Sequence, residues 1–402
     1  MSILNLLQIN SCNFGSTGSI MNHISELCMS NGINCYTSCP PGRSMTNDNL
    51  ENHIFIGTRL GHNIHLLLGS LLGIHGLLSI IDTIVFLRRI NKLHIDHIYL
   101  HNLHNCYINL PLLFGYIRRH EIPVIWTLHD CWAFTGRCPH FQITNCGNWE
   151  TGCHDCPYSK KDYPKTLTNT ACLQWKLKKR LFTGLKDLTI ITPSNWLASL
   201  AKRSFLGSYP VLTIYNGIQT EKYFSNNLIH KRFGNKTILL GVAFNWDYSK
   251  GLDVFVQLNT LIDHSKFQIV LVGVTDAIRK KLPNDIVALD KITNQSELIE
   301  IYNEADYLIN PTRQEVFGLV NVEALACGTP VIAFPTGGCV EVVNESCGYI
   351  TKEKTANSIF EALKILEARN LKPEKCQERA LNFSVNIMDH KLLCLFKDKG
   401  II

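Results

Sequence analysis

The sequence has little charge, no low-complexity tract and no internal repeat. Charged residues make up 18% of its 402 residues and hydrophobic residues 46%, which excludes a disordered or collagen-like chain and allows well-filled cores. A chain of this length is expected to form two or three domains. Its net charge of +6 is mildly basic and suits a partner with phosphates, such as a nucleotide or a lipid headgroup. Nucleic acid is disfavoured as a partner, because no nucleic-acid motif accompanies the charge.

A secretory signal is also missing. Residues 1–10 have no basic start and no small-residue cleavage site, and they are typical of a first buried strand. The sixteen cysteines therefore do not indicate the disulfide framework of a secreted protein. We expect a cytoplasmic chain whose thiols are mostly reduced.

Residues 64–81 form an apolar run without Asp, Glu, Lys or Arg, and the length of this run fits a membrane span. Its three glycines and two histidines favour a buried or surface helix instead. A helix lying in the membrane face is a further alternative, because Arg88, Arg89 and Lys92 follow and could meet anionic headgroups.

Short apolar runs alternate with helical patterns, which predicts an α/β chain of two doubly wound, Rossmann-like domains with the ligand site in the cleft between them. We expect a first domain over residues 1–216, a second over 217–380, and a C-terminal helix within 381–402 that packs back toward the first. The predicted strands cover residues 4–9, 35–38, 97–100, 124–128, 189–192 and 211–214, and then 237–242, 267–272, 287–289, 307–310 and 330–333.

The strongest motif lies between Asn310 and Glu341. It predicts a strand, a loop, a helix over residues 317–327 and another strand, with Gly328 ending the helix. The helix start offers free N–H groups and positive dipole to a diphosphate. Glu315 and Glu323 flank that start, eight residues apart, so one could face a sugar and the other a ribose.

This pattern resembles glycosyltransferase family 4, which comprises retaining enzymes of the GT-B fold. The resemblance implies that Glu315 contacts the transferred sugar, that Glu323 binds the nucleotide ribose, and that the donor diphosphate lies at the helix start, Phe317, Gly318 and Leu319. In the family an Arg precedes a Lys-Gly pair after an earlier strand, and the two cations neutralise the diphosphate without a metal. Here Lys250-Gly251 matches, but Asn245 stands at the position of the Arg and leaves the site one cation short.

Two segments of the first domain match the family's acceptor side. Gly15 and Gly18 follow the first strand and allow backbone to approach a phosphate or an acceptor. A later strand ends in Thr127-Leu128-His129-Asp130, and the resemblance implies that His129 lies beside the transferred sugar. Asp130 could orient His129 or the acceptor hydroxyl. His101 and His104 follow another strand and are expected to face the same cleft.

The loop of residues 131–157 is rich in cysteine. Structural zinc, disulfides and free thiols are all compatible with its spacing, which includes one Cys-x2-Cys pair. The four candidate zinc ligands are Cys138, Cys146, Cys153 and Cys156. The surrounding string resembles transferases from bacterial exopolysaccharide clusters, of the colanic-acid type.

Residues 160–186 hold eight Lys or Arg against one Asp and form an amphipathic pattern. This segment is either a solvated helix face or a docking surface for lipid headgroups or the pyrophosphate of a lipid-linked acceptor. Together with residues 64–92 it predicts contact with the inner face of the cytoplasmic membrane.

The sequence thus predicts a retaining transferase that moves a hexose from a nucleotide-diphosphate sugar to a saccharide, lipid-linked acceptor in bacterial surface polysaccharide biosynthesis. No cofactor is expected for catalysis, and zinc would be structural. Two alternatives stay open: a nucleotide-sugar epimerase of the same fold, and a non-enzymatic zinc-dependent binding protein.

Overall fold

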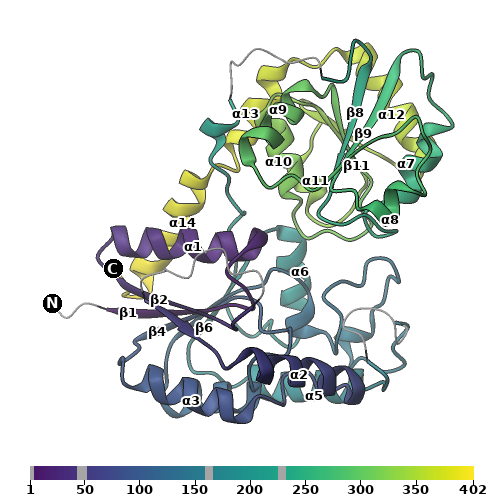
Figure 1. Ribbon diagram of the computed structural model, residues 1–402. Helices are drawn as coiled ribbons and strands as arrows, with labels where there is room; N and C mark the ends of the chain where they lie inside the picture. The colour runs from purple at the N-terminus through teal and green to yellow at the C-terminus, as the bar shows by residue number, and fades with distance from the viewer. Residues whose placement is uncertain (1–3, 43–51, 159–165, 225–231) are drawn as a thin grey trace. The chain divides into compact units, whose positions relative to one another are not determined.

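The computed structural model describes residues 4–42, 52–158, 166–224 and 232–402 (Figure 1). It divides into two compact units. The first unit comprises residues 1–214 together with 391–402, and the second comprises residues 215–390. The sequence prediction placed the join near Asn216 and gave the C-terminal segment from residue 381 to neither domain.

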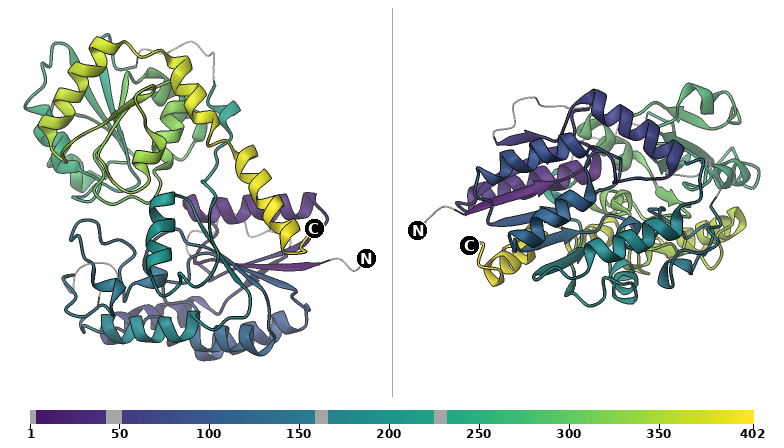
Figure 2. Two further views of the ribbon diagram at one scale, coloured as in Figure 1. Left: turned by 180° about the vertical axis from the view of Figure 1, so that it is seen from behind. Right: turned by 90° about the horizontal axis from the view of Figure 1, so that it is seen from below.

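The first unit contains a parallel sheet of seven strands in the order β3-β2-β1-β4-β5-β6-β7. Helix α1 covers one face of this sheet, and α3 and α5 cover the other (Figures 1 and 2). Its strands are β1 (Asn5–Ile9), β2 (Asn34–Cys39), β3 (His53–Phe55), β4 (His97–Leu100), β5 (Val124–Thr127), β6 (Leu188–Thr192) and β7 (Val211–Thr213). Its helices are α1 (Gly15–Ser30), α2 (Arg59–Leu72), α3 (Ile80–Asn91), α4 (Leu110–Arg119), α5 (Ala171–Phe182) and α6 (Asn195–Arg203).

The second unit contains a parallel sheet of six strands in the order β10-β9-β8-β11-β12-β13. Its strands are β8 (Thr237–Val242), β9 (Phe267–Val272), β10 (Val287–Leu289), β11 (Tyr307–Asn310), β12 (Val331–Ala333) and β13 (Gly348–Ile350). Its helices are α7 (Leu252–Asn259), α8 (Asp276–Arg279), α9 (Gln295–Glu304), α10 (Leu319–Ala326), α11 (Cys339–Val342), α12 (Ala356–Arg369) and α13 (Pro373–Leu381).

The second sheet is buried on both faces, as its continuous apolar strands require. Successive residues of β8 show this, because Leu240 packs in one core cluster with α9, α10 and α13, whereas Leu239 packs in another with α7 and α12. Each side of the sheet therefore excludes water, and the polar groups of the unit gather where the strands end.

The last helix, α14 (Val385–Asp398), continues from one unit into the other, since residues from Lys391 onward belong to the first unit. There Phe396 is fully buried and its ring meets Tyr99 edge to face, with centroids 6.3 Å apart. Lys399, just after the helix, forms an ion pair with Asp187 of the first unit.

The uncharged run of residues 64–81 does not form one helix, which corrects the single-helix expectation. It is split between α2 and α3 because Gly73 ends α2 with a left-handed backbone, φ +68°. A β-carbon at Gly73 would lie 2.5 to 2.9 Å from three threonine hydroxyls, so no other residue fits that turn. Over the residues with assigned positions, every helix is too short or too polar to cross a bilayer.

Candidate active site

The first group of polar side chains lies where β1, β4 and β5 end, and we call it the acceptor-side cluster. It comprises Gln8, His101, His104, His129 and Asp130. Gln8 is the last residue but one of β1, His101 directly follows β4, and His129 lies two residues after β5. Because these strands are parallel neighbours, their carboxyl ends meet at one edge of the sheet and bring the side chains together. A small open pocket includes in its lining every member of this cluster except Gln8. Its lining residues are 101–104, Trp126, 128–130, Trp132 and Ala133.

His101 is 1% exposed and lines the pocket together with His129. Its Nδ1 is 3.1 Å from His129 Nε2, and its Nε2 is 3.0 Å from Gln8 Oε1. Burial, and then the nearby His129, hold the pKa of His101 well below its usual value. His101 is thus enclosed largely by protein groups, and its role toward the acceptor stays a prediction.

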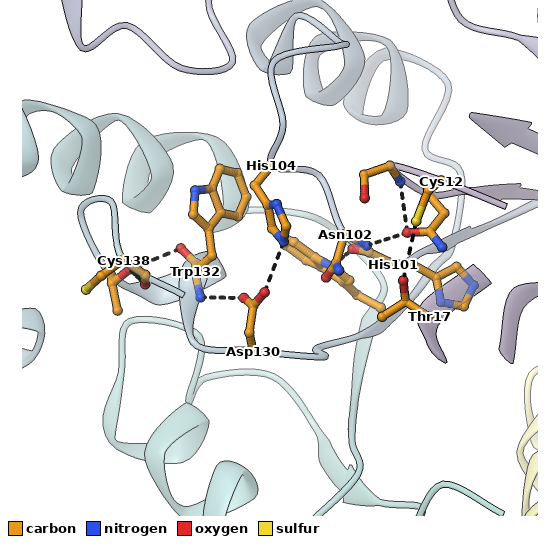
Figure 3. Close-up of polar contacts among 12 residues, drawn as sticks. Cys12, Thr17, His101, Asn102, His104, Asp130, Trp132 and Cys138 are labelled. Carbon is orange, nitrogen blue, oxygen red and sulfur yellow. Dashed lines mark hydrogen bonds and ion pairs between the residues drawn. The ribbon is translucent and has the colours of Figure 1, made fainter. Parts of the chain in front are cut away.

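His104 and Asp130 form an ion pair, with 3.0 Å between Nε2 and Oδ2 (Figure 3). Both side chains are only 13% exposed. Burial opposes the charge on each, but the partner outweighs burial, so the pKa of His104 is raised and that of Asp130 is lowered. The other oxygen of Asp130 accepts a hydrogen bond from the backbone N–H of Trp132. Asp130 is thus fixed from two sides.

The glycine loop after β1 is packed tightly. Gly15 opens α1 with φ +67° and has open space where a β-carbon would stand. At Gly18 a β-carbon would lie 2.3 Å from the carbonyl carbon of Asn13, so this glycine is required by backbone packing alone. Cys12 and Thr17 lie in the same loop, within 3.7 Å of each other through their polar atoms (Figure 3).

The cysteine-rich loop brings its four candidate ligands into one neighbourhood. Burial and the nearby thiols of Cys153 and Cys156 raise the pKa of Cys138 to about 12. Cys146 and Cys156 likewise lie close enough to raise the pKa of Cys153, which burial raises most. The described cysteines form no disulfide. In the part of the chain with assigned positions, no three His, Cys, Asp or Glu side chains are placed to hold a metal, and structural zinc stays a prediction.

A buried lysine underlies that loop. Lys178 of α5 donates hydrogen bonds to the carbonyl oxygens of Trp132 (2.7 Å) and Thr135 (3.0 Å). Its ammonium lies 3.6 Å from the centre of the Trp132 ring. Burial lowers the pKa of Lys178 to about 7, although Cys153, Cys138 and Asp130 oppose this. The sequence showed Lys178 as one charge of a basic stretch and gave no signal that it is buried.

The second group of polar side chains lies at the carboxyl ends of β8 and β11, and we call it the donor-side cluster. Lys250 Nζ and Glu315 Oε2 form an ion pair at 3.0 Å, with the side chains 36% and 22% exposed. Burial lowers the pKa of Lys250, but Glu315 raises it more, so the net direction is upward. Gly251 has φ +76° and a β-carbon there would meet the carbonyl oxygen of Pro311 at 2.5 Å, which explains the Lys-Gly pair.

Glu323 lies on α10 and its carboxylate is held by tyrosines. Tyr302 donates its hydroxyl to Oε2 at 2.9 Å, and the hydroxyl of Tyr223 lies beside it. Gln295 in turn donates to Tyr223 at 3.1 Å. Burial raises the pKa of Glu323, and the two tyrosine hydroxyls lower it. Sequence reasoning missed both tyrosines, which are distant from the motif along the chain.

The helix of the motif begins later than predicted. Gly318 has a left-handed backbone, φ +90°, and α10 starts at Leu319. A β-carbon at Gly318 would lie 2.9 Å from Asn321 Nδ2 and 3.3 Å from Cys339 Sγ, so only glycine fits this tight entry. Phe317 is 3% exposed and stacks on Tyr215 with centroids 5.6 Å apart. Its side chain belongs to the core, so its assignment to donor binding, which stays a prediction, concerns its backbone alone.

Arg313 is a residue of the motif whose contacts were missed. It forms two parallel hydrogen bonds to Asp253 at 2.7 and 2.8 Å, and a third to the carbonyl oxygen of Tyr248 at 2.7 Å. It therefore ties the loop that carries Lys250 to the loop that carries Glu315. Asn245 is exposed. A further cation close to this cluster is Lys354, whose charge, like that of Lys250, lowers the pKa of the Cys339 thiol that burial raises to about 12.

Comparisons with known proteins agree with this geometry. Residues 229–383 match the family model described as "Glycosyl transferases group 1". The colanic acid biosynthesis glycosyl transferase WcaC of Escherichia coli K12 is 26% identical over 266 residues. The matched residues cover 64% of this chain and 64% of WcaC, so the match spans less than two thirds of the length of that relative.

Two solved structures share the fold over the whole chain. Sucrose-phosphate synthase from Thermosynechococcus elongatus superposes with a TM-score of 0.71 at 16% identity and covers 99% of both chains. Anabaena HepE in complex with UDP superposes with a TM-score of 0.69 at 13% identity, over 99% of this chain and 100% of that one. Residues 229–383 are thus similar to the group 1 glycosyl transferases, and the whole chain shares its fold with these two solved structures.

Proposed function

We propose that the protein is a retaining hexosyltransferase of family 4, which takes a hexose from a nucleotide-diphosphate sugar and gives it to a hydroxyl of a saccharide acceptor. The observation that carries the proposal is the Lys250–Glu315 pair beside the start of α10. A lysine, a carboxylate and a helix N-terminus are together suited to one phosphorylated sugar, because the cation and the dipole take the phosphates and the carboxylate takes the sugar hydroxyls. Anabaena HepE, of the same fold, is described in complex with UDP, which supports a nucleotide partner.

The chemistry proposed is a front-face displacement. The bond between the anomeric carbon and the diphosphate oxygen breaks, and the bond to the acceptor oxygen forms on the same face. The proton of the acceptor hydroxyl passes to the departing diphosphate, whose charge Lys250 and the start of α10 stabilise. In the first unit His129 contacts the transferred sugar, and Asp130 is fixed by His104 and the Trp132 N–H so that it can orient the acceptor.

The test is transfer from a panel of UDP and GDP sugars to saccharide acceptors, with the anomeric configuration of the product read by NMR. A product with retained configuration supports the proposal, and an inverted product contradicts the mechanism. Release of an epimerised nucleotide sugar without a transfer product would favour the epimerase alternative. Unchanged activity of Glu315→Gln would contradict the site assignment, and Lys364→Ala, an exposed lysine of α12, serves as a control.

We also propose that the acceptor is lipid-linked and that the protein binds the membrane surface. Helices α2 and α3 expose large apolar side chains, among them Leu67 at 61% and Ile81 at 76%. Exposed Arg88 and Arg89 of α3 add positive charge, which suits anionic headgroups. Residues 160–165 of the basic stretch lie outside the described residues, and Lys176, Lys179 and Arg180 of α5 are exposed.

Vesicle flotation tests this surface. Binding to vesicles with anionic lipid, lost in Leu67→Asp, would support it, and equal binding to neutral vesicles would contradict the charge argument. Structural zinc at the four clustered cysteines stays a prediction, and elemental analysis of the purified chain decides it, since a bound ion would require the thiols to move closer together than they lie here.

A further inference from the structure

Gln8 is a fully buried amide in β1, between the apolar residues Leu7 and Ile9. Its amide nitrogen donates to the carbonyl oxygen of Met21 at 3.0 Å and to Cys35 Sγ at 3.3 Å. A carbonyl oxygen can only accept a hydrogen bond, so the nitrogen of Gln8 must face Met21. The orientation of the amide is therefore set by the backbone of α1, and its oxygen must face the other way.

That oxygen lies 3.0 Å from His101 Nε2. Because an amide oxygen only accepts, Nε2 of His101 carries the proton. His101 is buried, which favours its neutral form, and a neutral imidazole has one proton. Its other nitrogen, Nδ1, is left with a lone pair. Stacking on Tyr99, with ring centroids 4.9 Å apart, hinders a 180° flip of the His101 ring. The backbone of His101 is also held, because its carbonyl oxygen accepts a hydrogen bond from Trp126 Nε1 at 2.8 Å.

The lone pair of His101 Nδ1 lies 3.1 Å from His129 Nε2. His129 must therefore donate from Nε2. Burial lowers the pKa of His129 to about 4, so this ring is also neutral and its Nδ1 also carries a lone pair. Within the described residues no hydrogen bond reaches that nitrogen, and His129 lines the pocket.

We propose that Gln8 and His101 are positioning residues that fix the tautomer of His129, so that His129 presents a hydrogen-bond acceptor, and no donor, to its ligand. The ligand must then offer an O–H or N–H at this point. Resting on the proposed function, this group is a free hydroxyl of the transferred hexose or of the saccharide acceptor. A sugar that is deoxygenated or acylated at that hydroxyl would be a poor substrate.

The charged neighbours of His129 are compatible with its neutral state. Asp130 raises the pKa of His129 and His104 lowers it, and these two groups form an ion pair with each other. His101 faces the ring from β4 and is neutral. Burial thus stays the dominant influence on this ring.

The direct test is NMR of the full-length protein with ¹⁵N-labelled histidine rings. We expect His129 to carry its proton on Nε2, with a scalar coupling across the hydrogen bond to His101 Nδ1. A proton on His129 Nδ1, or on both of its nitrogens at pH 7, would overturn the proposal. This result does not depend on any transferase activity, so it separates the failure of the tautomer proposal from the failure of the proposed function.

Two variants at one position test the consequence. His101→Phe keeps the ring and its stacking but removes the acceptor for His129, whereas His101→Asn keeps an oxygen near the place of Nδ1 and loses the ring. We expect kcat of His101→Phe to fall by about tenfold to a hundredfold, and His101→Asn to recover most of that loss. Equal loss in both variants, with folding checked by circular dichroism, would show a packing role only and would contradict the proposal.

Substitution of Gln8 tests the same proposal from the other end of the hydrogen-bonded line of Gln8, His101 and His129. Gln8→Met fills the space of the amide without accepting a hydrogen bond, so His101 loses what fixes its tautomer. We expect the coupling between the two rings to weaken or disappear in Gln8→Met. An unchanged coupling would contradict the role of Gln8.

Discussion

The acceptor-side cluster and the donor-side cluster hold their polar groups in different ways. Gln8, His101 and His129 form a line of neutral hydrogen bonds that leaves the Nδ1 lone pair of His129 for a ligand. Lys250 and Glu315 are partly exposed opposite charges that pair with each other. A ligand can bind the first cluster without rearranging it, but in the second it must compete with the ion pair. Substitutions in the acceptor-side cluster should therefore change how the ligand is oriented, and substitutions in the donor-side cluster should change the affinity for a charged ligand.

The largest effect is expected at the ion pair. Lys250→Ala should lower kcat/KM by about a hundredfold to a thousandfold, because the departing diphosphate loses its cation. Steady-state kinetics with the active donor measures this, and Lys364→Ala should behave as wild type. Full activity of Lys250→Ala would show that another cation, with Lys354 the first candidate, carries the phosphate.

The His104–Asp130 pair tests whether the acceptor side is a rigid frame. Asp130→Asn should lower the free energy of unfolding by about 3 kcal/mol, since it removes the carboxylate that pairs with the buried His104 imidazolium. Because the pKa of His104 is raised in the folded state, the stabilisation is present at low pH and is lost as pH rises through that pKa. Because the pKa of Asp130 is lowered, the stabilisation is also lost as pH falls through the folded pKa of Asp130.

Urea unfolding of wild type and His104→Gln across pH measures this window. The stability difference should be largest at about pH 5 to 6 and should shrink at higher pH, because free histidine then loses its proton. A difference independent of pH would mean that the pair contributes through packing rather than charge.

The tyrosines around Glu323 give a smaller effect on nucleotide binding. Tyr302→Phe should weaken UDP or GDP affinity by about tenfold, because the carboxylate loses a hydrogen bond that holds it. The loss should grow at low pH, since removing that bond raises the pKa of Glu323 further. Calorimetry at several pH values measures both. Tyr116→Phe, whose hydroxyl meets only Asn91 on α3 at 3.4 Å, is the matched control.

The smallest effect separates stability from ligand binding. Gly73→Ala should destabilise the protein by about 1 to 2 kcal/mol, because alanine is strained at φ +68° and meets three hydroxyls. Gly115→Ala, on exposed helix α4 with open space around it, should stabilise by up to about 1 kcal/mol. Thermal unfolding measures both, and nucleotide affinity should stay as in wild type. A changed nucleotide affinity in either variant would contradict the expectation that these glycines affect stability and not ligand binding.

The sequence predicted the elements whose signal is local. Strands β4 and β8 to β11 have the predicted bounds, because each is an apolar run between turns. The short strands β3 and β13 were not predicted, since three residues of mixed polarity carry no periodic pattern. The start of α10 and the break between α2 and α3 depend on Gly318 and Gly73, which have a left-handed backbone. The amino-acid sequence alone does not reveal that backbone conformation.

For the candidate site, the motif indicated the residues but not their partners. Gln8 was visible as a polar residue between apolar neighbours of the first strand, yet its bond to His101 joins residues 93 apart. Arg313 was part of the motif, and its pair with Asp253 is set by the packing of two loops. Such contacts arise from tertiary structure, and one sequence contains no signal for them.

The buried amine of Lys178 has a consequence for the order of folding. Its bonds to Trp132 and Thr135 join α5 to residues 46 and 43 positions earlier in the chain. The cysteine-rich loop cannot satisfy those carbonyl groups until α5 has docked, so we expect the loop to become ordered in a late step. During refolding we expect the fluorescence of Trp132 to be quenched only after the helical signal has formed. In Lys178→Met both this quenching and its delay relative to the helical signal should be absent.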